Sequence, residues 1–299
     1  MSASLKFKQL GLIGCGLMGA SFALALQKHG LVDKVKGFSL SQRTRERALQ
    51  LGVIHQAATS AKQAVEGCDI VLLAVPVSRT AECLQAIAPA LSPNCLLMDV
   101  GSTKTDVVAA AMAHLGERLP CFVPAHPIAG KAQAGLDHAE AGLYQDRRAI
   151  LTPLAQTGAV QLENAKRVWT AIGSHVSLMN PQDHDATFAA VSHVPHLLAF
   201  AAVNALSAQD QGAAFLKMAG PGFRDFSRIA ASDPDVWRDI LSANQAEVLK
   251  QTGHFRAALD AFEKAIEQND LNKLHMLIEQ ASRVRASWTL QSGQTEHDD

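Results

Sequence analysis

The sequence LGLIGCGLMGASFALAL, at Leu10–Leu26, decides the fold class. A short apolar run ends at Gly14, glycines follow with the spacing G-x-G-x-x-G up to Gly19, and a helical pattern continues from there. In this strand–turn–helix context the glycines allow a tight turn, a close approach of the backbone to a pyrophosphate, and close packing of helix on strand. The N-terminus of the helix then offers free N–H groups to phosphate oxygens. The stretch therefore predicts a dinucleotide-binding unit.

Apolar segments of strand length alternate with helical patterns over the first 180 residues. We predict strands at residues 34–39, 69–75, 95–100, 122–125, 149–153 and 175–178. Such alternation is typical of a doubly wound parallel sheet, in which ligands bind at the carboxyl ends of the strands. Val75–Pro76, Gly101–Ser102 and His126 all follow or end a predicted strand, so the fold alone would gather them around one crevice. We expect residues 1–180 to form a Rossmann-type domain.

From Pro181 onward the pattern changes to helices, predicted at residues 182–206, 213–218, 236–251, 256–269 and 271–288. Pro181 and Pro234 suit first-turn positions, where the missing amide proton costs nothing. We expect residues 181–290 to form an all-α domain like that of 6-phosphogluconate dehydrogenases. Its many alanines and leucines suit a subunit interface or an ordinary core. Residues 291–299 are polar, and we expect a disordered tail.

Composition narrows the class of protein. The net charge of −1 includes no basic block, so nucleic acid is not an expected partner. The five cysteines form no C-x-x-C pair, which favours a reducing compartment and disfavours a disulfide framework. No uninterrupted apolar run approaches the roughly 18 residues that span a bilayer, and the N-terminus lacks the apolar region of a signal peptide. We expect a cytoplasmic protein that binds no membrane.

The end of the second predicted strand bears on cofactor choice. An NAD-specific site places a carboxylate there to bind the ribose hydroxyls. This chain has Ser39, followed by Arg43, so nothing repels a 2′-phosphate and both side chains could bind one. We predict NADP as the preferred cofactor, with NAD as the alternative; the arginine could equally be a solvated surface charge. The residues expected to contact the cofactor are Gly14, Gly16, Leu17, Met18, Gly19, Ser39, Arg43, Val75, Pro76 and Gly101.

A histidine between two prolines, in Pro124–Gly130 (PAHPIAG), is the first catalytic candidate. Proline fixes its own φ and restricts the preceding residue, so His126 should lie on a stiff loop, whether as a structural turn or as a catalytic group. Neutral imidazole, with a pKa near 6.5, suits the removal of a hydroxyl proton. His193 and His196 are spaced like a metal pair, but no third ligand of the right character accompanies them. We expect no metal site, and a packed structural role for His193.

Four further motifs carry a family resemblance. DVGSTK at residues 99–104, HPIAG at 126–130, SHVPH at 192–196 and GFRDFSRIA at 222–230 follow the glycine-rich loop in order. Together they resemble the prephenate/arogenate dehydrogenases of tyrosine biosynthesis, over the chain as far as about Trp288. The resemblance implies oxidative decarboxylation of a cyclohexadienol, prephenate or arogenate, with hydride transfer to NADP or NAD. The products would be 4-hydroxyphenylpyruvate or tyrosine.

The resemblance also implies roles for individual residues. His126 matches the family's catalytic histidine, and Ser102 matches a serine that bonds near the substrate hydroxyl and orients that histidine. Arg228 matches the substrate-binding arginine, and His196 matches an active-site histidine on the first long helix of the second domain. Trp237 occupies the position of a tryptophan that reaches the neighbouring subunit's site. This implies a homodimer formed through the helical domain.

Some assignments stay open at this stage. Arg224 lies one helical turn from Arg228, although the resemblance favours the latter. Asp185 could meet the amino group of arogenate. Lys131 and Ala132 stand where several relatives have Thr-Glu, which replaces a carboxylate with a cation near the mouth of the site.

Two rival functions also remain. A dehydrogenase of the 3-hydroxyacid or 6-phosphogluconate type would use a lysine of the second domain. Lys217 is the obvious candidate there, and its flanking residues do not match. A non-catalytic NADP-sensing module would predict a degraded catalytic set, whereas His126, Ser102, His196 and Arg228 are all present.

Overall fold

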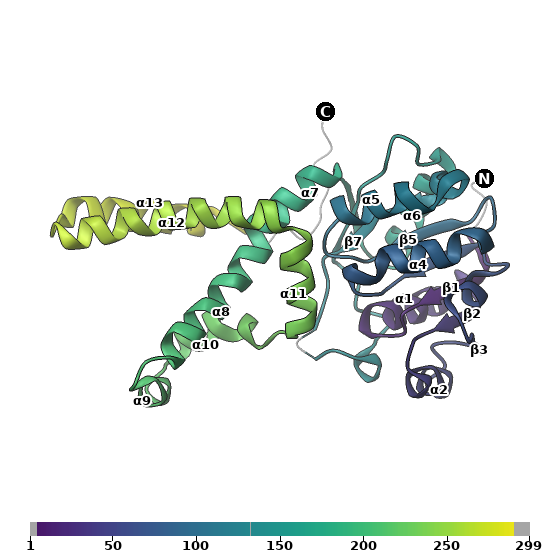
Figure 1. Ribbon diagram of the computed structural model, residues 1–299, viewed down its shortest axis with the longest axis horizontal. Helices are drawn as coiled ribbons and strands as arrows, with labels where there is room; N and C mark the ends of the chain where they lie inside the picture. The colour runs from purple at the N-terminus through teal and green to yellow at the C-terminus, as the bar shows by residue number, and fades with distance from the viewer. Residues whose placement is uncertain (1–4, 132, 290–299) are drawn as a thin grey trace. The chain divides into compact units, whose positions relative to one another are not determined.

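The computed structural model describes residues 5–131 and 133–289, so Ala132 and the expected tail at 291–299 lie outside the described residues. The chain divides into two compact units, drawn in Figure 1. The first contains the described residues up to Asp185 together with Ser232–Ala243, and the second contains Ala186–Ala231 and the described residues from Asn244 onward. The return of residues 232–243 to the first unit has no counterpart in the sequence pattern. The two units are described separately.

The first unit is built on a six-stranded parallel sheet with the strand order β3-β2-β1-β4-β5-β6. The prediction of a doubly wound sheet is confirmed. Strands β2 and β4 flank β1 on opposite sides, so the chain reverses direction across the sheet between β1 and β4, where such folds bind ligands. The strands are β1 (Phe7–Ile13), β2 (Val32–Phe38), β3 (Gln56–Ala57), β4 (Ile70–Leu73), β5 (Leu96–Asp99) and β6 (Phe122–Val123).

Alternate side chains of each strand feed two separate cores, because successive residues of a strand point to opposite faces. In β4, Ile70 and Leu72 join the core that contains Phe22 and Trp169, whereas Val71 and Leu73 join the opposite core. Helices α1 (Leu17–Lys28) and α6 (Ala159–Ala171) contribute to the first core. Helices α3 (Ala61–Val65), α4 (Thr80–Ile87) and α5 (Thr105–His114) contribute to the second.

The remaining short elements connect these layers. Helix α2 spans Gln42–Gln50, and the 3₁₀ turns are η1 (Val77–Arg79), η2 (Ala88–Ala90), η3 (Gly116–Cys121) and η4 (Leu136–His138).

A second sheet of three strands begins immediately after β6. Strand β7 (Ala125–Pro127) pairs antiparallel with β8 (Arg148–Leu151), which pairs parallel with β9 (His175–Leu178). The strands predicted at 149–153 and 175–178 are confirmed and pair with each other, but the predicted single strand at 122–125 is wrong. Pro124 has no N–H to donate to a sheet, and the chain passes from one sheet to the other at this residue. His126 therefore lies in a strand, opposite Ile150, rather than in a loop.

A buried ion pair joins three elements of the first unit. The side chain of Lys104 is fully buried and pairs with that of Asp99, which is 3% exposed. Asp99 also accepts hydrogen bonds from the amides of Gly101 (2.8 Å) and Ala125 (2.9 Å), while Lys104 Nζ donates to the Ala125 carbonyl (2.8 Å). The pair thus connects the end of β5, the start of α5 and the start of β7.

The predicted helix at 236–251 is wrong, because the chain forms two helices there. Helix α11 (Pro234–Ala243) belongs to the first unit, and Ser78 of η1 donates a hydrogen bond to its Asp239. Asn244 leaves helical geometry, and α12 (Gln245–Glu267) runs on through Gly253. A single exposed glycine costs a helix only about 1 kcal/mol, so the predicted break between residues 251 and 256 does not occur.

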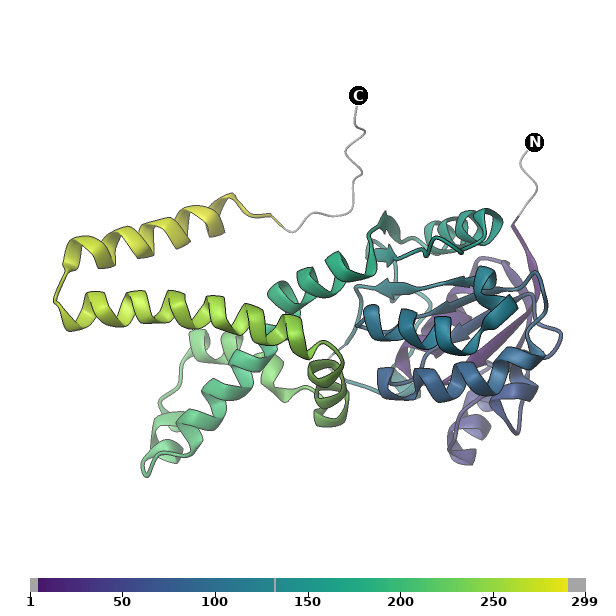
Figure 2. The same ribbon diagram turned by 45° about the horizontal axis from the view of Figure 1, so that its top comes forward.

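The second unit is helical, as expected. Helices α12 and α13 (Leu271–Ser287) form an antiparallel hairpin (Figure 2), and Asp270 caps α13 by accepting a hydrogen bond from the Lys273 amide (2.9 Å). The other elements are α8 (Val194–Ser207), α9 (Gly212–Lys217), α10 (Pro221–Ser227) and the 3₁₀ turn η6 (Arg228–Ala231).

One helical segment, Pro181–Ser207, crosses the division between the units. It comprises α7 (Pro181–Phe188), the π-helical turn η5 (Ala189–His193) and α8. Pro195 explains the π turn, because it cannot donate to the carbonyl four residues earlier and its ring displaces that carbonyl. An 18-residue window of this 27-residue segment has a mean hydropathy of 1.5, so by length and composition alone the segment could cross a membrane. The core helix of a soluble protein meets the same two criteria.

We predict that Lys104→Met destabilises the protein by about 3–5 kcal/mol, because it leaves the buried Asp99 carboxylate without its cation. The measurement is urea-induced unfolding of both variants followed by circular dichroism. The control is Lys6→Met, which removes an exposed pair with Asp33 (side chains 54% and 51% exposed) and should change stability by less than about 1 kcal/mol. Equal losses in the two variants would contradict the prediction.

Candidate functional site

The glycine-rich loop has the geometry that the sequence motif predicts. Gly14 has φ +94°, and a Cβ there would stand 2.1 Å from the Ala74 carbonyl oxygen. A Cβ on Gly19 would stand 2.1 Å from the Gly14 carbonyl oxygen, so α1 packs close to β1 because residue 19 has no side chain. A Cβ on Gly16 would meet nothing within 4 Å. The backbone at Gly16 therefore faces open space, where a phosphate can approach it.

Two neighbouring cavities lie at the carboxyl ends of β1 and β4, and both are lined by Ala74, Val75 and Pro76. One, of about 600 Å³, reaches the end of β2 and is also lined by Ile13, Gly14, Phe38, Ser39, Leu40, Thr59, Ser60, Ala61, Arg79, Glu82, Cys83 and Ala86. The other, of about 340 Å³, is also lined by Gly16, Leu17, Met18, Val77, Val100, Gly101, Ser102, Ala134, Gly135, Val236, Asp239 and Ile240. Two cavities meeting at a strand switch point suit the two halves of a dinucleotide.

The end of β2 brings one of the two predicted cofactor-selecting residues to the larger cavity. Ser39 lines it, and its hydroxyl accepts a hydrogen bond from the Cys15 amide in the glycine-rich loop (2.8 Å). Arg43 is exposed on α2 and lines a different cavity with Glu46, Arg47, Gln50 and Asp137. Arg45 instead donates to the carbonyls of Ser39 and Leu40.

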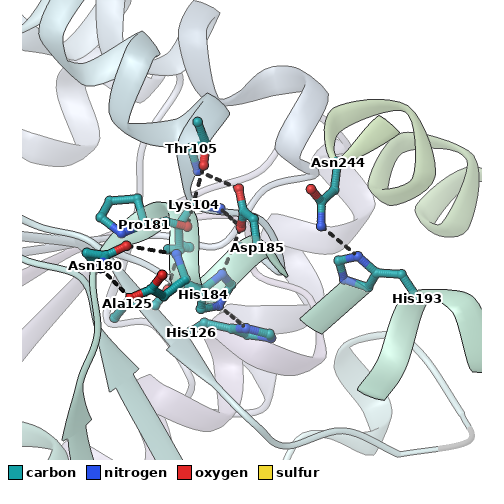
Figure 3. Close-up of polar contacts among 12 residues, drawn as sticks. Lys104, Thr105, Ala125, His126, Asn180, Pro181, His184, Asp185, His193 and Asn244 are labelled. Carbon is teal, nitrogen blue, oxygen red and sulfur yellow. Dashed lines mark hydrogen bonds and ion pairs between the residues drawn. The ribbon is translucent and has the colours of Figure 1, made fainter. Parts of the chain in front are cut away.

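His126 contacts a second histidine that the sequence analysis did not single out. His126 Nδ1 lies 2.8 Å from His184 Nε2, with the ring centroids 5.0 Å apart (Figure 3). His184 Nδ1 in turn lies 2.8 Å from Asp185 Oδ1. His126 is half-buried in β7, whereas His184 and Asp185, in the first turns of α7, are 0% and 4% exposed.

Asp185 caps the N-terminus of α5 from 80 residues away in the sequence. Its two oxygens accept hydrogen bonds from the amides of Lys104 and Thr105, each at 2.8 Å. Burial raises the pKa of Asp185, but the hydrogen bonds from His184, Thr105 and the backbone outweigh it and hold that pKa below its usual value. Burial lowers the pKa of His184, so Asp185 is ionised and His184 is neutral at pH 7. The idea that Asp185 meets a substrate amino group is wrong, because its carboxylate is buried in this cap.

The second unit carries two of the predicted substrate ligands, His196 and Arg228. His196 Nδ1 bonds to the Ser192 carbonyl (2.9 Å). Burial lowers the pKa of His196, and the positive charge of Arg228 lowers it further against the opposing effect of Ser192. Arg224, which the sequence left open beside Arg228, is exposed and pairs with Asp225 (3.0 Å).

His193 is buried in the second unit and contacts Asn244, the residue at which the predicted helix breaks. His193 Nδ1 lies 3.2 Å from Asn244 Nδ2. This is the packed structural role that the sequence analysis expected for His193.

Comparisons with known proteins bear on this architecture. The family model described as the nucleotide-binding domain of prephenate dehydrogenase matches residues 22–178, and the one described as its dimerization domain matches residues 180–280. The chain belongs to the prephenate dehydrogenase family.

Individual members of the prephenate dehydrogenase family align along almost the whole chain. The cyclohexadienyl dehydrogenase of Zymomonas mobilis is 32% identical over 98% of both chains. The crystal structure of prephenate dehydrogenase from Aquifex aeolicus, in complex with hydroxyphenyl propionate and NAD⁺, is 33% identical and covers 96% of this chain and 99% of its own, with a TM-score of 0.88. Synechocystis arogenate dehydrogenase is 29% identical over 94% of this chain and 100% of its own, with a TM-score of 0.80.

The rival dehydrogenase class shares the fold at lower similarity. A 3-hydroxyisobutyrate dehydrogenase from Salmonella typhimurium has a TM-score of 0.55 at 18% identity. This likeness concerns the fold alone.

The predicted site residues fall into groups. Eight of the ten cofactor candidates line the two cavities: Gly14, Gly16, Leu17, Met18, Ser39, Val75, Pro76 and Gly101. Ser102 lines the smaller cavity, and Trp237 is half-buried on α11, whose neighbouring residues line the same cavity. Gly19 acts through packing, and Arg43 lies elsewhere.

Sequence reasoning missed His184 and Lys104. Lys104 stands inside the DVGSTK motif, where an apolar strand followed by a lone acid and a lysine signals a buried pair. His184 directly precedes Asp185 near a proline-started helix. However, its separation of 58 positions from His126 in the sequence hides their contact from any local pattern.

The departure from relatives at residue 131 has a local structural role. Lys131 Nζ forms an ion pair with Glu140 (2.9 Å) and donates to the His138 carbonyl (2.9 Å). The gained cation is thus paired with an acid of the same loop.

The two glycine substitutions Gly16→Ala and Gly19→Ala should separate binding from folding. Gly19→Ala forces a Cβ against the Gly14 backbone and should lower the free energy of unfolding by about 1–3 kcal/mol. Gly16→Ala has room within the protein, so stability should hold within about 0.5 kcal/mol while cofactor affinity falls at least about tenfold. Urea denaturation and titration of the reduced cofactor's fluorescence measure the two quantities. Stability losses of equal size would refute this division of roles.

Proposed function

We propose that the chain catalyses the oxidative decarboxylation of prephenate, arogenate or both, with hydride transfer to a nicotinamide cofactor. One observation carries most weight. The Asp99 carboxylate holds the amide of Gly101, which lines the smaller cavity, and the amide of Ala125, which precedes His126. A single buried group thus fixes the catalytic candidate relative to the cavity. Full-length similarity to prephenate and cyclohexadienyl dehydrogenases supports the same activity.

His126 would act as the base. The substrate carbon that bears the hydroxyl loses hydride to the cofactor, and His126 takes the hydroxyl proton, leaving a carbonyl at that carbon. Loss of CO₂ sends its bonding electron pair through the ring to that oxygen, which takes the proton back as the ring becomes aromatic. Ser102, at the cavity wall, would hydrogen-bond near the substrate oxygen. The cofactor supplies the hydride acceptor when bound.

Arg228, His196 and Trp237 would complete the substrate site. Arginine presents a planar fork of donors that matches a carboxylate. A neutral His196 donates its one ring proton from Nδ1 to the Ser192 carbonyl, so its Nε2 can accept a hydrogen bond from the substrate. Trp237 would reach the site of the neighbouring subunit in a homodimer built on the helical domain, whose family model is described as a dimerization domain. We place residues 1–180 in the nucleotide-binding domain, residues 181–290 in the substrate and dimerisation domain, and the enzyme in the cytoplasm.

NADP is the cofactor that we expect this enzyme to prefer, over NAD. The support is the hydroxyl of Ser39 at the position where an NAD-specific site carries a carboxylate, since a serine does not repel a 2′-phosphate. Arg43, on the adjacent helix, would lend positive charge. The cofactor contacts would be Gly14, Gly16, Leu17, Met18, Ser39, Val75, Pro76 and Gly101. Gly19 would shape the loop, and Arg43, which lines a different cavity, would act through its charge.

The direct test is reduction of NADP and NAD with prephenate and with arogenate as substrates. We expect turnover with at least one pair. His126→Asn should lower kcat by about 10²–10⁴-fold, because the proton acceptor is lost. The dissociation constant of the cofactor should stay within about twofold of the wild type. No reduction with either substrate would reject the proposed function, and an unchanged kcat in His126→Asn would reject the role of the histidine.

Cofactor choice is tested by Ser39→Asp. The aspartate can still accept from the Cys15 amide, but its charge should repel a 2′-phosphate. We expect the ratio of kcat/KM for NADP over NAD to exceed one in the wild type and to fall at least about tenfold in the variant. Arg43→Ala is the matched control for loss of a nearby cation and should lower the ratio less. A wild-type ratio below one would reverse the cofactor assignment.

A further inference from the structure

The contact between His126 and His184 determines which ring nitrogen of His126 carries the proton. An imidazole between two partners has one nitrogen for each, and its neutral form carries a proton on only one of them. Which nitrogen of His126 bears the proton decides which nitrogen can take a proton from a substrate. The hydrogen bonds behind His126 settle this question.

The chain of bonds has a fixed starting point. The amides of Lys104 and Thr105 can only donate, so Asp185 accepts from both (2.8 Å each). An ionised carboxylate has no proton to give, so His184 must donate to it from Nδ1. A neutral His184 then has its lone pair on Nε2. His126 Nδ1, 2.8 Å from that lone pair, must carry the proton and donate it.

The polarity therefore runs in one direction, from His126 through His184 to Asp185. We propose that His184 is a positioning residue that holds neutral His126 as the Nδ1–H tautomer, with the proton-accepting lone pair on Nε2. Asp185 and the first amides of α5 set the tautomer of His184 in turn. The inference deepens the proposed function and rests on it for the role of His126 as base.

Charge and burial around His184 fit this task. His184 is fully buried and Asp185 is 4% exposed, so water does not compete for their hydrogen bonds. The charged groups that act on His184 are Asp185, Lys104 and Asp99, and the last two form an ion pair. Burial lowers the pKa of His184, which keeps its Nε2 unprotonated. After His126 accepts a proton on Nε2, its Nδ1–H still has an acceptor, now in a stronger, charge-assisted bond.

The decisive readout is the tautomer itself. Nitrogen chemical shifts of ¹⁵N-histidine-labelled enzyme, without substrate, report which ring nitrogen of His126 is protonated, and His126→Asn assigns the signals. We expect Nδ1–H in the wild type. His184→Phe keeps a ring but removes the acceptor, so His126 should leave the pure Nδ1–H form. His193→Phe removes a buried histidine outside the relay and should leave the His126 tautomer unchanged.

Activity gives the second readout. His184→Phe should lower kcat at least about tenfold, with little change in the KM of the cofactor. This loss should be smaller than the roughly 10²–10⁴-fold loss that follows removal of the base itself in His126→Asn. His184→Gln places an amide oxygen near the position of Nε2 and should restore part of the kcat and the Nδ1–H signal. An Nδ1–H form that persists in His184→Phe, or an Nε2–H form in the wild type, would overturn the proposal. The tautomer is measured without substrate. If His126 shows the Nδ1–H form but the enzyme is inactive on both prephenate and arogenate, the proposed function is rejected and the tautomer proposal stands.

Discussion

The carboxylate of Asp99 is the constraint on which the site depends. It lies at the carboxyl end of β5, buried, with one cation and two backbone amides as partners. A charge in such surroundings persists only when its hydrogen bonds and its counter-ion are all in place, because the cost of desolvation is several kcal/mol. Lys104 satisfies the charge and binds the carbonyl of Ala125 as well. The cofactor cavity and the strand of His126 therefore share one anchor.

A second buried carboxylate extends the same design. Asp185 takes the place of a local N-cap for α5, since Lys104 stands at the capping position and its side chain is already paired. The amides of Lys104 and Thr105, which have no acceptor within their own helix, donate to Asp185 and hold it where it orients His184. The N-terminus of α5 thus contributes to the site through Asp185 and His184.

The sequence predicted those parts that follow from local pattern. The glycine spacing, the alternation of apolar segments and the proline-started helices gave the parallel sheet and the helical second unit. The cavity residues at strand ends followed from topology. What sequence could not supply were contacts across long separations, such as His126 with His184. It also missed the change of sheet at Pro124 and the break at Asn244, because each depends on which partner the backbone finds after folding. The break predicted between residues 251 and 256 does not occur, because the helix continues on either side of Gly253.

The hydrogen bond between Ser39 and the Cys15 amide has a consequence for how such an enzyme can diverge. It attaches Ser39, which directly follows β2 and which we propose to face the adenosine ribose, to the glycine-rich loop. Strands β1 and β4 separate β2 in the sheet from β5 and its buried acid. On the proposed assignment, changes at Ser39 would alter the choice between the two nicotinamide coenzymes without touching the groups that handle protons. Changes at Asp99 or Lys104 would disturb both the coenzyme cavity and the strand of His126, because Asp99 bonds to both and Lys104 is its counter-ion. Substitutions near the end of β2 should therefore be tolerated more readily than substitutions at the end of β5.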